Sequence, residues 1–259
     1  MNALTDKNRA EALSKVPAVT LVFWIIKILA TTLGETGGDT LSMTFNLGYL
    51  VSTFIFLPLL AIFILLQIRA ARFHPWLYWA TIIASTTAGT TIADFATRSL
   101  GIGYPGGSLL LLTLVLISLF VWYRSLGTVR VEAITSRRAE LFYWITITFS
   151  QTLGTALGDW TADVPGFGYL GAAALFAGLL AIMLMLHYAT AVSKVWLFWA
   201  AFILTRPLGA TVGDFLDKPI DKGGLDLSRP IASLVLAVLI VGCIALLPQR
   251  AGRHPGEAA

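Results

Sequence analysis

Eight long apolar runs alternate with short polar breaks along the 259 residues of the chain. A helix needs about 20 apolar residues to cross the hydrocarbon core of a bilayer. The runs cover roughly 17–38, 46–68, 76–93, 106–123, 140–158, 169–192, 195–213 and 230–248. Transmembrane β-strands are shorter and alternate in polarity, which these runs do not. The pattern predicts an all-α membrane protein with eight transmembrane helices, the first of them a retained span and not a cleaved signal.

Basic residues are distributed unevenly over the polar breaks. If the N-terminus is placed in the cytoplasm, the cytoplasmic breaks hold Lys7, Arg9, Lys15, Arg69, Arg72, Arg124, Arg130, Arg137, Arg138, Lys194, Arg250 and Arg253. The opposite side holds only Arg98, Lys218, Lys222 and Arg229. Lys and Arg accumulate in cytoplasmic loops of membrane proteins. The distribution therefore predicts that both termini are cytoplasmic.

A short phrase recurs near the end of every second apolar run. It reads LGETGGDT (33–40), AGTTIADF (88–95), LGTALGDW (153–160) and LGATVGDF (208–215). Fifteen residues before each Asp stands a Trp, and another aromatic residue precedes that Trp: Phe23–Trp24, Tyr78–Trp79, Tyr143–Trp144 and Phe198–Trp199. So many matches at fixed offsets identify an internal repeat. Each of the four repeats holds two spans, so all four have the same orientation in the membrane.

The spacing of the repeated Asp residues, 55, 65 and 55, divides the chain into two pseudo-symmetric halves. We expect a cytoplasmic N-terminal segment (1–16), a first half with repeats 1 and 2 (17–124) and a cytoplasmic linker (125–139). A second half with repeats 3 and 4 (140–248) and a cytoplasmic tail (249–259) follow.

Two recurring positions have structural interpretations. Small residues precede each Asp by five and by one, and they include Gly34, Gly38, Gly89, Gly154, Gly158, Gly209 and Gly213. Such a pattern lets membrane helices approach closely, and it would draw the repeat carboxylates together. For the repeated Trp we favour an interfacial aromatic anchor; the alternative is a packing or gating role inside the bundle.

The repeated acids are the main candidates for an ion-binding site. An ordinary helix end at the outer interface is the alternative for each Asp, but helix C-termini favour cations. Unusually polar positions also precede the acids, and they predict a wetted path. The predicted ion ligands are Glu35, Asp39, Asp94, Asp159 and Asp214, and the predicted path contains Thr32, Thr36, Thr87, Thr91, Gln151, Thr152 and Thr155. Ionisable residues within spans are functional candidates by default.

Departures from the repeat predict a specialised site. Only the first repeat has a second acid, Glu35, one turn before Asp39 and so on the same helix face. We expect Glu35, Asp39 and Asp214 to form the core of a metal site, with Arg206 and Lys27 as counter-ions. The alternative is that Arg206 only neutralises Glu35. Pro207 is expected to bend or break its helix.

Composition and net charge restrict the partners, metal ligands and enzyme classes that we expect. The chain is 57% hydrophobic and 12% charged, and its net charge of +4 follows from topology, so we do not expect nucleic acid as a partner. One Cys and three scattered His exclude a disulfide framework and argue against thiolate, His-based and haem sites. Carboxylate ligands favour hard cations such as Mg²⁺, Ca²⁺ or Mn²⁺, although Na⁺, K⁺ or H⁺ would also fit. Without a nucleophile elbow or phosphate loop, we do not expect an enzyme.

The repeat resembles a bacterial membrane-protein family that is defined by four tandem repeats of unknown function, each with two spans and a signature Trp. Trp24, Trp79, Trp144 and Trp199 match that description over nearly the whole chain. The resemblance implies an eight-span protein of the bacterial inner membrane and no particular activity.

A transporter for a small cation, with or without proton coupling, is the leading functional hypothesis. A passive channel with a ring of four Asp is the second, and a membrane scaffold or sensor with an architectural repeat is the third. The expected partners are the lipid bilayer and a small ion or solute, with no cofactor other than a cation as substrate. The oligomeric state stays open.

Overall fold

The computed structural model describes residues 13–131, 134 and 136–253. Eight long helices occupy these residues: α2 (Leu21–Asp39), α3 (Gly48–Arg69), α4 (Pro75–Asp94), α5 (Gly103–Leu126), α6 (Arg137–Ala162), α7 (Gly168–Ala189), α8 (Lys194–Asp217) and α9 (Arg229–Leu246). Each corresponds to one predicted apolar run, and the all-α fold is confirmed. Lys7 and Arg9, which the topology prediction uses, lie outside the described residues, as do most of 1–16 and part of 249–259.

Short elements mark the two ends of the bundle. Strands β1 (Leu13–Pro17) and β2 (Ala251–Arg253) pair antiparallel next to the linker between the halves, where the Lys15 N–H donates to the Ile134 carbonyl over 3.2 Å. The π-helical turns η1 (Thr40–Thr44) and η2 (Phe95–Ser99) and the 3₁₀ turn η4 (Ile220–Lys222) lie beyond the Asp ends of α2, α4 and α8. The β1–β2 pair and the repeated Asp residues therefore occupy opposite ends of the bundle.

Local sequence explains where the inner helices begin. The Thr20 hydroxyl accepts from the Phe23 N–H at the start of α2, and the Ser136 hydroxyl accepts from the Ala139 N–H at the start of α6. Such hydroxyl caps satisfy backbone donors that have no helical partner. Pro75 occupies the first position of α4, where its missing N–H costs nothing.

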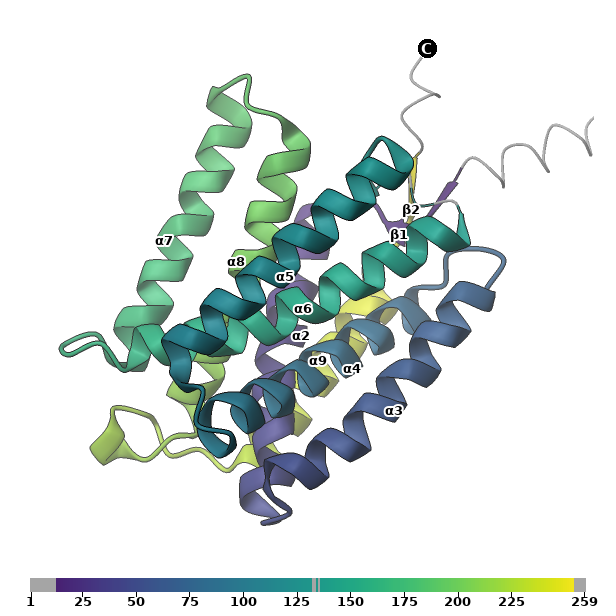
Figure 1. Cartoon of the computed structure of the whole chain (residues 1–259). Coiled ribbons are helices and arrows are strands. Elements are labelled where there is room, and N and C mark those ends of the chain that lie inside the picture. Colours follow the sequence, from purple (N-terminus) through teal and green to yellow (C-terminus); the bar gives the residue numbers. More distant parts are fainter. Residues whose placement is uncertain (1–12, 132–133, 135, 254–259) are drawn as a thin grey trace, which may run out of the picture.

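The first helix of each repeat belongs to an inner bundle (Figure 1). Around this bundle α2 packs on α4, α4 on α6, α6 on α8 and α8 on α2. The second helix of each repeat covers the first helix of the next one: α3 covers α4, α5 covers α6, α7 covers α8, and α9 covers α2. The fourth repeat thus closes on the first, so the tandem repeat forms a ring.

Burial is inverted relative to a soluble protein. α3 buries only Ser52, Leu60 and Gln67 and exposes a nearly continuous apolar surface, whereas α4 buries most of its residues, including its threonines. Apolar residues outside and polar residues inside fit a lipid environment. Six helices are long and apolar enough to cross a membrane, namely α2 extended to Thr44, α3, α5, α7, α8 and α9. The other two, α4 and α6, carry much of the buried polar surface.

Five layers of side chains lie along the inner bundle, at successive four-residue steps before each repeated Asp. They are the Asp layer (Asp39, Asp94, Asp159, Asp214), the Glu35 layer (Glu35, Thr90, Thr155, Ala210), the Arg206 layer (Thr31, Thr86, Gln151, Arg206), the Lys27 layer (Lys27, Ile82, Ile147, Phe202) and the aromatic layer (Phe23, Tyr78, Tyr143, Phe198). All of these residues are buried except Phe198, which is half-buried. Buried side chains from all four inner helices therefore occupy each layer, apart from the half-buried Phe198.

Glycine allows the inner helices to approach closely. The glycine five residues before each Asp packs against the Arg206-layer residue of the following repeat: Gly34 on Thr86, Gly89 on Gln151, Gly154 on Arg206 and Gly209 on Thr31. A Cβ atom at any of these positions would overlap its neighbour or press tightly on it. The small residues predicted as packing positions thus lie at the helix contacts, and the last contact closes the ring between α8 and α2.

Three of the four repeated Trp residues are buried inside the protein, which corrects the interpretation of these three as interfacial anchors. Trp79, Trp144 and Trp199 are 0%, 1% and 2% exposed, and Trp24 is half-buried. They pack on the aromatic layer; the centroids of Trp144 and Tyr78, for example, are 5.8 Å apart. The Trp199 indole donates to the Val129 carbonyl over 2.9 Å. Buried indoles pack well when their N–H finds an acceptor, so Trp199 joins the bundle to the linker.

We predict that Gly209→Ala destabilises the protein by about 1–3 kcal/mol, as overpacking of a tight contact does. The added methyl group would overlap the Thr31 side chain and backbone. Unfolding in mixed detergent measures the change. The matched control is Gly178→Ala in α7, where a Cβ atom meets nothing within 4 Å. Equal stability of the two variants would contradict the close contact.

Candidate ion-binding site

Arg98 joins two of the four repeated carboxylates. Its Nε atom lies 3.0 Å from Asp94 Oδ1, and its Nη2 atom lies 2.9 Å from Asp159 Oδ2. Asp94 precedes Arg98 by four residues, and Asp159 belongs to the neighbouring inner helix, α6. One guanidinium thus bridges a pair of buried acids from repeats 2 and 3 and compensates one of their two charges.

Lys218 holds the other two repeated carboxylates. Its ammonium contacts Asp39 Oδ2 directly and lies 2.8 Å from Asp214 Oδ1 and 3.7 Å from Asp217 Oδ1. Burial opposes a charge on this lysine, but Asp214, Asp39 and Asp217 outweigh it and raise the pKa of Lys218 well above its ordinary value. Arg229 completes the cluster, with its Nε atom 3.2 Å from Asp217 Oδ2.

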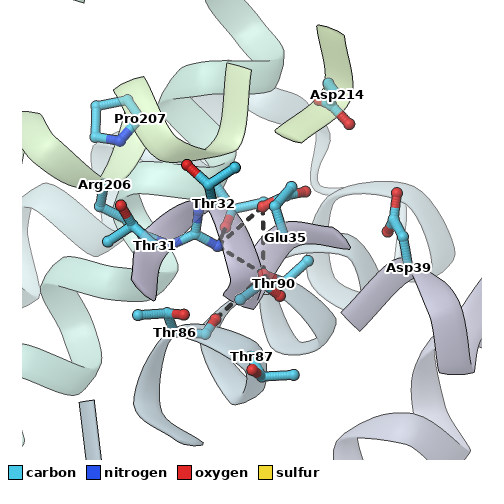
Figure 2. A network of polar contacts seen from close by, with 12 residues as sticks. Thr31, Thr32, Glu35, Asp39, Thr86, Thr87, Thr90, Arg206, Pro207 and Asp214 are labelled. Carbon is cyan, nitrogen blue, oxygen red and sulfur yellow. Dashed lines mark hydrogen bonds and ion pairs between the residues drawn. The ribbon is translucent and has the colours of Figure 1, made fainter. Parts of the chain in front are cut away.

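Arg206 connects all four inner helices one layer deeper (Figure 2). Its Nη2 atom lies 2.9 Å from Glu35 Oε2 on α2, 2.6 Å from the Thr90 hydroxyl on α4 and 2.5 Å from the Thr155 hydroxyl on α6. All of these groups are buried. α8 continues through Pro207 as one helix, so of the two expected effects of this proline a break does not occur. The stem of Arg206 and the ring of Pro207 both pack on Gly154, which has no side chain to obstruct them.

Three carboxylates converge at the boundary of the Asp and Glu35 layers. Glu35, Asp39 and Asp214 each offer one oxygen atom, and these atoms all lie within 4.8 Å of one another. Asp39 and Asp214 lie on the far side of Glu35 from Arg206 (Figure 2). Asp39 Oδ1 and Asp214 Oδ2 are buried and accept no hydrogen bond from the described residues. This is the set that the sequence singles out as a metal site, and its hard oxygen ligands suit Mg²⁺, Ca²⁺ or Mn²⁺.

The charges of the outer cluster do not balance. Five carboxylates (Asp39, Asp94, Asp159, Asp214, Asp217) contact three basic side chains (Arg98, Lys218, Arg229), which leaves a formal charge of −2. Buried charge of one sign is unfavourable unless a proton or a cation compensates it. A divalent cation or two protons would neutralise this cluster.

Several predicted site residues have other environments. None of the four Asp residues is a solvated helix end, since each is at most 4% exposed and each forms an ion pair with Arg98 or Lys218. Lys27, expected as a counter-ion, forms no ion pair with the described residues; its ammonium lies 4.1 Å from the Phe202 ring centroid. The Lys27 layer, defined above, contains no carboxylate that could pair with this ammonium.

On α2 and α4, the layer residues each precede a residue of the predicted polar path by one position. The hydroxyls of Thr32, Thr87 and Thr152 donate to carbonyls of their own helices, and Thr91 does the same. Thr36 donates within α2 and accepts from Ser233 of α9. The axial positions are Thr31, Thr86 and Thr90, and the hydroxyls of Thr86 and Thr90 donate to carbonyls of α2 over 3.1 Å. Gln151 and Thr155 lie in the axial layers as expected.

The bases that hold the Asp layer are not among the site residues predicted from the sequence. Arg98 and Lys218 were counted only as outer-side charges, although each follows a repeated Asp by four residues. Repeats 1 and 3 have Met43 and Asp163 at that position. An acid and a base four residues apart share a helix face, so this alternation between repeats was the available signal.

We predict that Arg206→Met costs about 3–5 kcal/mol of stability, because it leaves Glu35 buried without its charged partner. The double variant Arg206→Met, Glu35→Met should recover part of that loss, since no isolated charge remains. Unfolding free energies in mixed detergent test both. A double variant that is no more stable than Arg206→Met would contradict the assigned pair.

Comparison with known families identifies four consecutive copies of one motif. The Repeat of Unknown Function (DUF347) matches residues 22–73, 77–128, 142–193 and 197–249, each copy comprising one inner helix and the outer helix that follows it. Comparison with curated proteins and with solved structures finds no match. The four copies cover most of the chain, and the protein therefore belongs to the family defined by this repeat of unknown function.

Proposed function

We propose that all eight helices span a bacterial inner membrane, with both termini in the cytoplasm. α4 and α6 are flanked by α3 and α5, which are apolar enough to span. The described basic residues predicted as cytoplasmic, such as Arg69 and Arg137, lie near the helix ends on the β1–β2 side. In this topology the Asp layer faces the outer side.

We further propose that the protein transports a small cation, with a divalent metal such as Mn²⁺, Ca²⁺ or Mg²⁺ as the favoured class. The observation that carries this proposal is the convergence of one oxygen atom each from Glu35, Asp39 and Asp214. The formal charge of −2 on the outer cluster supports a divalent ion. Because protons can replace a metal at carboxylates, the same cluster offers a route to proton coupling.

Lys218 would act as a tethered cation in this mechanism. Its ammonium contacts Asp39 and Asp214, two of the three proposed metal ligands. A metal ion would have to displace it. Lys218 lies at the end of α8 and begins a loop that folds back on the helix, with the Leu225 N–H donating to the Phe215 carbonyl over 2.8 Å. Displacement of Lys218 would therefore couple cation binding to movement of this loop.

A carrier fits the bundle better than a permanently open channel. Side chains occupy every layer of the inner bundle, and Arg206 reaches across from α8 to the three other inner helices. In the aromatic layer, the hydroxyls of Tyr78 and Tyr143 are 2.6 Å apart. An ion could pass these layers only if the helices rearranged, which is the property of a carrier.

We predict that liposomes containing the wild-type protein take up Mn²⁺, Ca²⁺ or Mg²⁺, and that Asp39→Asn and Asp214→Asn reduce the rate at least tenfold. Each substitution removes a ligand charge from the cluster. A divalent-sensitive dye follows entry with and without a pH gradient. The matched control is Asp163→Asn, which changes an exposed acid on the same side.

Different outcomes separate the alternatives. Uptake that needs the two acids and responds to the pH gradient supports a proton-coupled carrier. Conductance independent of the gradient, at channel rates, would favour the pore. If folded protein gives no flux, or if the variants match wild type, the cation-transport proposal is wrong and an architectural role for the repeat gains support.

A second prediction concerns the tethered cation. Lys218→Met should lower the Mn²⁺ concentration for half-maximal uptake severalfold, because the metal no longer competes with an ammonium. Lys222→Met, a change of an exposed lysine in the same loop, is the control. Unchanged or weaker apparent affinity in Lys218→Met would show that the lysine does not compete with the metal.

A further inference from the structure

Lys27 is a fully buried basic residue without a polar partner. Its side chain is 0% exposed, and its Nζ atom donates no hydrogen bond to the described residues. The ammonium lies 4.1 Å from the centroid of the Phe202 ring, and the other members of its layer are Ile82 and Ile147. Buried polar groups are nearly always hydrogen-bonded, so this group calls for an explanation.

Further unpaired donors occur in the adjacent layer. Arg206 is also 0% exposed, and its Nε and Nη1 atoms have no acceptor in the described residues, although Nη2 has three. Gln151, in the same layer, leaves both side-chain polar atoms without partners. The Lys27 ammonium packs on Phe202, which precedes Arg206 by one helical turn. The unpaired donors thus occupy neighbouring layers.

The formal charge of this region specifies the kind of ligand. The Lys27, Arg206 and Glu35 layers contain two basic side chains and one carboxylate, a net charge of +1 when all are ionised. Buried ions are stable only when they are paired and hydrogen-bonded. One monovalent anion that accepts from several donors would satisfy both requirements.

We infer that the bundle binds a small monovalent anion, of the size and charge of chloride, between Lys27 and Arg206. The lysine ammonium and the unpaired guanidinium nitrogens supply its donors, and Gln151 contributes its amide N–H groups. Ile82 and Ile147 flank the site and favour a weakly hydrated anion. This site is deeper than the carboxylate cluster and opposite to it in charge, and the inference does not depend on cation transport.

Thermal unfolding of the purified protein tests the inference, with Trp fluorescence as the signal. Chloride or bromide replaces gluconate, which is too large for the site, at constant ionic strength. A ligand that binds only the folded state raises Tm in a saturable way. We expect such a rise for wild type and for the control Lys222→Met, and its loss in Lys27→Met. Absence of a halide effect in wild type, or an equal effect in Lys27→Met, would overturn the inference.

Crystals grown in bromide provide a test that needs no variant. An anomalous difference peak within hydrogen-bonding distance of Lys27 Nζ and the Arg206 guanidinium supports the site even if Lys27→Met fails to fold. A well-ordered map without a peak there would show that Lys27 is accommodated without an anion, as an uncharged amine. Both measurements are independent of the flux assay, so the failure of one proposal leaves the other standing.

Discussion

The Arg206 guanidinium is the interaction on which the inner bundle depends. It starts from α8 and reaches Glu35 on α2, Thr90 on α4 and Thr155 on α6 within 2.9 Å. It can do so because Gly154 leaves room for its stem. A charged hydrogen bond in a low-dielectric interior is strong and directional. A single side chain therefore joins all four inner helices, which the other contacts join only in pairs.

Around this contact the repeat has diverged into two electrostatically different regions. The Asp layer pairs its acids through Arg98 and Lys218 and keeps an excess of negative charge. The layers below contain Lys27 and Arg206 against a single acid, Glu35. A fourfold repeat with identical residues could not produce this polarity along its axis. The asymmetric substitutions at repeats 1 and 4 create it, and they meet because the fourth repeat closes on the first.

Sequence reasoning predicted the eight helices, the repeat and the Glu35, Asp39 and Asp214 cluster, because hydropathy and fixed spacings determine these directly. It failed where the outcome depends on which helices become neighbours. The repeated Trp pattern is typical of interfacial anchors, but packing of the inner bundle buries Trp79, Trp144 and Trp199. The choice between Thr31 and Thr32, or between Thr86 and Thr87, depends on the rotation of a helix, and spacing alone does not specify it. Lys218 contacts Asp39 because α8 lies beside α2, and the sequence alone does not show that these two helices are neighbours.

The central claim is that the outer carboxylates form a binding site for a divalent cation. Its most direct test is an equilibrium titration of the purified protein with Mn²⁺, with free Mn²⁺ measured by electron paramagnetic resonance and Mg²⁺ and Ca²⁺ used as competitors. The account predicts one saturable site per chain, lost when Asp39 and Asp214 are both replaced by Asn. Absence of saturable binding of any of the three ions, or equal binding by that double variant, would contradict it.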